Sequence, residues 1–131
     1  MSTVKADNFT WKTGQATGQP GTNVTGDQIV YGVCKAWISI NGVSPISTRA
    51  AFNFSSVTRN AGGDYTFTFT NVMVDVNYSV SGTGGQGAAG QQTGQMGVWN
   101  SAPTASSFRA GYVYNGVTAY DIDWIYAQVH R

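Results

Sequence analysis

A run of six residues, Tyr65–Thr66–Phe67–Thr68–Phe69–Thr70, alternates aromatic and hydroxyl side chains without a break. Successive side chains of a strand point to opposite sides, so this period of two is typical of a β-strand with one buried face. The run lies in a segment from Cys34 to Asn77 that carries few charges outside its turns. The segment predicts an all-β fold.

Other segments show the same period and end at turn residues, such as Asn41–Gly42 and Asn115–Gly116. We expect strands at 33–40, 49–58, 65–70, 76–81, 96–99, 107–114 and 120–131. No segment repeats apolar residues at helical spacing over a useful length. The pattern predicts an antiparallel β-sandwich, with a small barrel as the alternative.

Two further segments set the domain organisation. Residues 1–30 are polar and rich in turn residues, and they predict an extended N-terminal arm with a short strand at 4–11. Residues 31–131 form the predicted β-domain. Within it, the tract 82–95 consists only of Gly, Gln, Ala and Thr, a low-complexity composition that predicts a loop. The loop is either a solvent-exposed connection or a tip that contacts a partner.

The charge content favours an assembled protein. Only 10% of the 131 residues are charged and the formal net charge is +1, whereas about 25% charged residues is usual. A near-neutral surface promotes association. The seven Lys and Arg residues are scattered, which disfavours nucleic-acid binding. We expect no signal segment, no membrane insertion and a buried structural thiol at Cys34.

Catalytic chemistry has little support in the sequence, and we expect no enzyme, no metal and no cofactor. All six acidic residues are Asp. Asp121 and Asp123 share one face of a predicted strand, where pairing with Arg109 is the favoured role and a calcium site the weaker alternative. His130 and Cys34 do not make a zinc site or a nucleophile–base set.

Aromatic residues, 13% of the chain, are the remaining candidates for binding. Most are expected to be structural, including Trp37, Phe52, Phe54, Phe67, Phe69 and Tyr126. An aromatic platform flanked by amides could stack on a sugar, although a core or subunit interface is the more common role. The candidate host-surface contacts are Gln86, Gln91, Gln92, Trp99, Tyr112, Tyr114 and Asn115. The candidate docking residues of the arm are Val4, Phe9 and Trp11.

An ordered series of motifs runs from residue 35 to residue 78. Its parts are Lys35 to Gly42, Arg49, Phe52 to Ser56, Asn60 to Thr66, Phe67 to Thr70 and Asp75 to Tyr78. This series closely resembles a segment common in bacteriophage virion fibre or knob proteins, especially those of marine and cyanobacterial viruses. The chain departs from that pattern at 43–45 and at 73–74, where the resemblance leaves the turn geometry open.

The resemblance implies a virion structural protein made in the host cytoplasm. Fibre domains of this kind are generally homotrimers, so the implied partners are further copies of the chain and a larger protein of the tail or capsid. Host attachment through a surface glycan is the expected function of such a tail-fibre or knob module. The alternative is a head-attached fibre, decoration or connector protein with no receptor-binding role.

Overall fold

The computed structural model describes residues 33–86, 93–98, 101–114 and 118–131, and within these ranges every regular element is a strand. No helix in the described ranges has the length and hydropathy needed to cross a bilayer. The predicted arm, with Val4, Phe9 and Trp11, lies outside them. The strands are β1 (Cys34–Asn41), β2 (Ser47–Phe52), β3 (Phe54–Ala61), β4 (Asp64–Phe69), β5 (Ser79–Gly85), β6 (Thr93–Val98), β7 (Ser107–Tyr114), β8 (Thr118–Ala119) and β9 (Trp124–His130).

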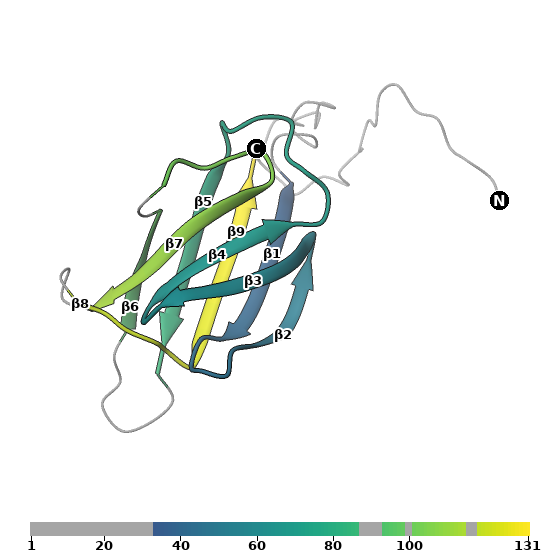
Figure 1. Ribbon diagram of the computed structural model, residues 1–131. Helices are drawn as coiled ribbons and strands as arrows, with labels where there is room; N and C mark the ends of the chain where they lie inside the picture. Colours follow the sequence, from purple (N-terminus) through teal and green to yellow (C-terminus); the bar gives the residue numbers. More distant parts are fainter. Residues whose placement is uncertain (1–32, 87–92, 99–100, 115–117) are drawn as a thin grey trace, which may run out of the picture.

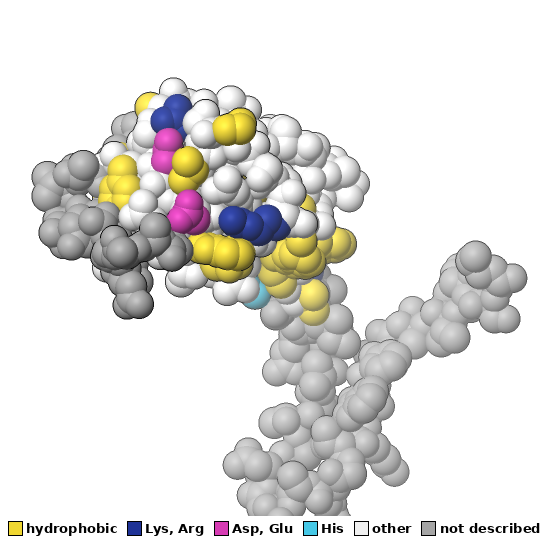
Figure 2. Space-filling view, turned by 90° about the horizontal axis from the view of Figure 1, so that it is seen from below, with side chains coloured by type: hydrophobic (Ala, Val, Ile, Leu, Met, Phe, Trp, Pro, Cys, Tyr) yellow, Lys and Arg dark blue, Asp and Glu magenta, His cyan; other side chains and the backbone are white. Residues whose placement is uncertain are grey.

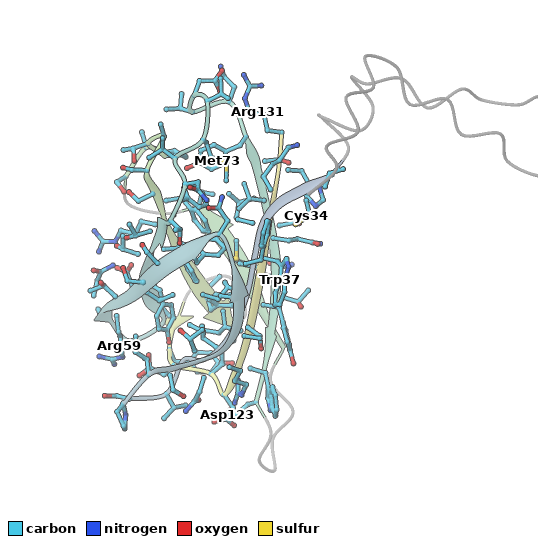
Figure 3. All side chains as sticks on the ribbon, turned by 90° about the vertical axis from the view of Figure 1, so that its right-hand side faces the viewer. Cys34, Trp37, Arg59, Met73, Asp123 and Arg131 are labelled. Atoms are coloured by element: carbon cyan, nitrogen blue, oxygen red, sulfur yellow. The ribbon has the colours of Figure 1, made fainter. Side chains whose placement is uncertain are left out.

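The strands form one antiparallel sheet in the order β2-β1-β9-β5-β6-β7-β4-β3, with β8 paired to β7. The sheet folds over on itself, so that β3, β4 and β7 lie in front of β1, β9 and β5 (Figure 1). Seen edge-on, the two layers carry Trp37 on one side and Arg59 on the other (Figure 3). The predicted all-β fold is confirmed as a nearly closed, barrel-like sheet with two packed layers.

The two end strands of the sheet, β2 and β3, are consecutive in the chain and separated by Asn53 alone. Asn53 adopts a φ of 58°, a left-handed conformation that asparagine tolerates better than most residues. Its side chain donates to the carbonyl oxygens of Lys35 (3.1 Å) and Asn71 (3.2 Å) and accepts from the Asn71 N–H (2.7 Å). The single strand predicted at 49–58 was therefore wrong, because Asn53 turns the chain from one layer to the other.

The alternating residues of the central strands fill the core between the layers. Phe67 and Phe108 stack across β4 and β7, with ring centroids 4.9 Å apart and an interplanar angle of 13°. Phe54 packs edge-on against both rings at 6.0 Å. These contacts confirm the predicted inward face of residues 65–70. The other large, fully buried side chains are Tyr65, Tyr112, Ile40, Ile122, Ile125 and Val129.

The low-complexity tract contributes two strands rather than only a loop. β5 extends to Gly85 and pairs with β9, and β6 begins at Thr93. Gly82 lies against Met96 and the carbonyl oxygen of Tyr126, where a Cβ atom would have no room. The predicted loop at 82–95 was therefore wrong for 82–85 and 93–95, since the absence of side chains there permits close packing of neighbouring strands.

The last strand begins later than predicted. Alternation from residue 120 would place Ile122 and Ile125 on opposite faces, yet both are fully buried. The reason is a bend at Asp123, after which β9 starts at Trp124. From there Ile125, Ala127 and Val129 point into the core and the intervening residues point outward.

Candidate functional site

Exposed aromatic side chains gather on the outer face of the layer formed by β2, β1, β9 and β5. Trp37 and Tyr126 are each 44% exposed, Trp124 is 42% exposed and Phe52 is 54% exposed. The strand register places Trp37 opposite Phe52 on one side and opposite Gln128 on the other, and it places Tyr126 opposite Ser39. Seen from one end, hydrophobic side chains gather along the lower margin of the described body, beside a positive charge (Figure 2). We call the surface formed by the exposed aromatic residues, Trp37, Phe52, Trp124 and Tyr126, the aromatic face.

A groove runs across the aromatic face between Trp37 and Tyr126. It has a volume of about 470 Å³, and the Gly82 backbone forms part of its lining. Polar groups from three strands complete it, because β1, β9 and β5 are adjacent and their outward residues share one side. Those polar residues are Ser39, Ser81, Thr83 and Gln128.

The end of the aromatic face is held by stacked rings and an arginine. The rings of Trp124 and Tyr126 are stacked at 6.5 Å with an interplanar angle of 15°. The Arg49 guanidinium lies 3.8 Å from the centre of the Trp124 ring, a cation–π contact. Arg49 also donates to the carbonyl oxygens of Ile40 (2.5 Å) and Asp123 (2.7 Å). The Nη1 group of Arg49 is therefore engaged by two backbone carbonyl oxygens while the guanidinium lies over the Trp124 ring.

The outer surface of the other layer has a different character, because an ion pair occupies it. Arg109 on β7 donates from Nε and Nη2 to the two carboxylate oxygens of Asp64, at 2.8 and 2.5 Å. This bond raises the pKa of Arg109. Asn60 donates to both Asp64 (3.2 Å) and Thr66 (2.9 Å). The predicted pairing of Arg109 with Asp121 or Asp123 was wrong, since β4 lies beside β7 and brings Asp64 to it instead.

Asp121 joins the β3–β4 hairpin to the segment before β9. Its carboxylate accepts from Arg59 Nε (2.9 Å), the Gly63 N–H (2.9 Å) and the Tyr65 hydroxyl (2.8 Å). Burial favours the neutral carboxyl, but these bonds together outweigh it and hold the pKa of Asp121 below its ordinary value. Burial and the bond to Asp121 raise the pKa of Tyr65. The role of Asp121 is thus structural.

Acid should weaken the fold through Asp121. Its folded-state pKa is lowered, so the stability it contributes is present above its unfolded pKa and lost as pH falls through the folded value, below about pH 4. We expect Asp121→Asn to lower the free energy of unfolding by about 2 kcal/mol at neutral pH. Urea unfolding at several pH values should show this difference shrinking in acid. A difference independent of pH would contradict the assignment.

The weaker sequence alternative, a calcium site at Asp121 and Asp123, gains no support from the geometry. The carboxylate of Asp121 already binds a cation, because Arg59 forms a 2.7 Å salt bridge with it. Within the described ranges, no three His, Cys, Asp or Glu side chains come together as a metal site. The thiol of Cys34, predicted to be buried, is half-buried and donates to the Ala36 carbonyl oxygen at 3.1 Å.

The structure describes three of the predicted host-contact residues. Tyr112 is fully buried, and its hydroxyl contacts Met96 Sδ (3.0 Å) and the Tyr126 carbonyl oxygen (3.1 Å). Its assignment as a surface contact was therefore wrong, because its position on β7 faces the core, where burial raises its pKa. Gln86 is half-buried just after β5, and Tyr114 ends β7. The others, Gln91, Gln92, Trp99 and Asn115, lie outside the described residues.

The aromatic face was missed because its members were expected to be structural. Trp37, Phe52 and Tyr126 are exposed rather than buried, although large aromatic residues are usually well buried. The signal was present in the alternation, which puts Trp37 on the same side as Lys35 and Ser39. That side carries polar residues, so it is the outer one.

A second group of exposed apolar side chains lies at one end of the body. Val33, Val72, Val74 and Val76 are 50%, 67%, 88% and 51% exposed. We call these four residues the valine end. Beside them is a pocket of about 370 Å³ lined by Lys35, Asn53, Asn71, Val72, Met73, Val74 and Arg131. Met73 and Arg131 lie at the same end of the molecule in Figure 3.

Comparison with known proteins adds no family assignment: the chain matches no protein-family model, no curated protein and no solved structure.

Proposed function

We propose that this chain is a structural subunit of a bacteriophage virion, a tail-fibre or knob-type module that forms a homotrimer and takes part in host attachment. The resemblance of residues 35–78 to phage fibre segments supports the virion assignment. The low charge content, 10% of residues, supports a subunit that buries surface against other copies.

One observation carries the proposal: apart from Val98 on β6, the exposed large apolar side chains of the described residues belong either to the aromatic face or to the valine end. The valine end includes Val33, the first described residue after the predicted docking arm of residues 1–30. The aromatic face lies on the side of the body, across β1 and β9. Exposed apolar patches of this kind mark interaction surfaces. The valine end suits assembly, and the aromatic face suits contact with an outside surface.

The charged residues support a structural role as well. Arg59 with Asp121, and Arg109 with Asp64, join segments that are distant in sequence. Each carboxylate accepts several hydrogen bonds from the protein. These acids hold strands together, as expected for a subunit whose work is mechanical and adhesive.

Assembly is tested by the mass of the purified chain in solution. We expect light scattering to give about three times 13.9 kDa. Val72→Ser combined with Val74→Ser should shift the mass toward that of one chain, because both residues are exposed at the valine end. Val98→Ser is the matched control, since Val98 is 47% exposed on β6. A monomeric wild-type chain would contradict the homotrimer.

Attachment is tested by binding of the labelled chain to bacterial host cells or their purified lipopolysaccharide. Binding by the trimeric wild-type chain supports the fibre or knob function. A chain that ignores cells but docks on capsid or tail proteins would instead be the decoration or connector protein that the sequence leaves as the alternative.

A further inference from the structure

The groove of the aromatic face has the composition of a sugar site. We propose that Trp37 and Tyr126 flank a subsite for one neutral pyranose ring, with Gln128, Ser39, Ser81 and Thr83 as its polar contacts. This inference rests on the proposed function, because it supplies the chemical contact for host attachment.

The two rings stand at the right positions to flank a small ligand. Trp37 pairs with Gln128 and Tyr126 pairs with Ser39, so the two aromatic residues are diagonal neighbours on β1 and β9. Diagonal neighbours on one face of a sheet are within reach of large side chains. The groove volume, about 470 Å³, falls in the range of small-molecule sites. The negative face of an aromatic ring attracts the C–H groups on the apolar side of a pyranose.

The polar groups beside the rings are available to a ligand. Within the described part of the chain, the side chains of Ser39, Ser81, Thr83 and Gln128 make no hydrogen bond to the protein. Three hydroxyls and one amide offer both donors and acceptors. A sugar hydroxyl also donates and accepts, so its chemistry matches theirs. A purely apolar partner would leave these groups buried without hydrogen bonds, which is unfavourable.

The charge of the groove selects against ions. Its lining residues include no Asp, Glu, Lys, Arg or His. The nearby Arg49 is engaged by Trp124 and by two backbone carbonyl oxygens. An anionic sugar or a phosphate would therefore find no cation among the residues that line the groove to offset its lost hydration. A neutral hexose is the ligand class that fits.

The groove is also held in place before any ligand binds. Tyr126 is stacked on Trp124, and its carbonyl oxygen is contacted by the buried Tyr112 hydroxyl. Gly82 on β5 pairs with Ala127 on β9, which fixes the backbone of the lining. A preorganised site loses less conformational freedom on binding.

The test titrates the purified full chain with the methyl pyranosides of glucose, galactose and mannose, followed by NMR. We expect at least one to bind at millimolar concentration and sialic acid, the matched anionic probe, to bind more weakly. Trp37→Ala and Tyr126→Ala should each weaken binding about tenfold or more. Gln128→Ala should weaken it less. Phe52→Ala is the matched control, an exposed aromatic residue of the same face outside the groove lining, and should bind as wild type.

Three results would overturn the subsite. They are no binding of any neutral pyranoside, unchanged binding by a Trp37→Ala variant with wild-type circular dichroism, and a lower assembly mass for that variant, which would assign the face to a neighbouring copy. Failure of the subsite is distinct from failure of the proposed function. A trimer that binds cells but no pyranoside loses only the subsite, whereas a monomer that binds the sugar but no cells loses only the function.

Discussion

Replacing Gly63 with alanine should lower the free energy of unfolding by about 3 kcal/mol. Gly63 has a φ of 68°, which costs an L-residue about 1–2 kcal/mol. A Cβ atom there would lie 2.7 Å from the Tyr120 carbonyl oxygen and 2.9 Å from that of Tyr112, and it would also meet the Tyr120 nitrogen. These are backbone atoms, so no side-chain rotation relieves the overlap, and overpacking adds about 1–3 kcal/mol. Thermal unfolding should show a Tm lower by roughly 15 °C.

The neighbouring glycine provides the control for this substitution. A Cβ on Gly62 would have Arg59 Nη2 as its nearest neighbour, at 3.8 Å. Gly62→Ala should therefore change stability by less than about 0.5 kcal/mol. Equal effects at the two positions would show that Gly63 does not sit against the segment before β9 as described. The comparison also tests the Asp121 network, since the Gly63 N–H donates to that carboxylate.

Gly84→Ala should destabilise the protein by about 2–3 kcal/mol. Gly84 faces the core from β5, and its Cβ would lie 2.9 Å from the Tyr112 ring and 3.0 Å from the Trp124 carbonyl oxygen, besides overlapping the end of Ile122. The Ile122 side chain can rotate, whereas the buried ring and the backbone of β9 have little freedom. Urea denaturation gives the measurement, through a lower midpoint at an unchanged slope.

Gly85, the next residue, is the control because its Cβ would meet nothing within 4 Å. Gly85→Ala should leave the urea midpoint close to that of the wild type. If Gly84→Ala were equally silent, then the glycine tract would not form the inner part of β5, and the paired register with β9 would be contradicted.

Much of the fold follows from alternation, and the exceptions have physical causes. The bounds of strands with regular alternation, such as residues 65–70 and 107–114, are predicted well because the alternation is visible in the side chains, although Tyr112 was wrongly assigned to the surface. Alternation does not reveal the bend at Asn53, because Phe52 and Phe54 continue the period of two although the backbone turns between them. The one local signal is that asparagine tolerates a left-handed φ.

Prediction from the sequence fails at the glycine tract and at the exposed aromatic rings for opposite reasons. Glycines carry no side chain and so give no periodic signal, even where Gly82 and Gly84 are needed for close approach of strands. Trp37 and Tyr126 do carry a signal, but the usual burial of aromatic residues argues against the face that their neighbours indicate. The candidate site therefore depended on the paired register of β1, β9 and β5, which joins Trp37 to Gln128 and Ser81 to Gln128 across long stretches of sequence.

The position of β1 between β2 and β9 bears on how the body would carry load. β1 is paired with β9 along most of its length, from Cys34 opposite His130 to Ile40 opposite Ile125, and with β2 only from Trp37 to Asn41. A pull arriving at Val33 runs along β1, at right angles to those hydrogen bonds. Both ladders are then sheared at once rather than opened one bond at a time. A body tethered through this strand resists tension as a single unit.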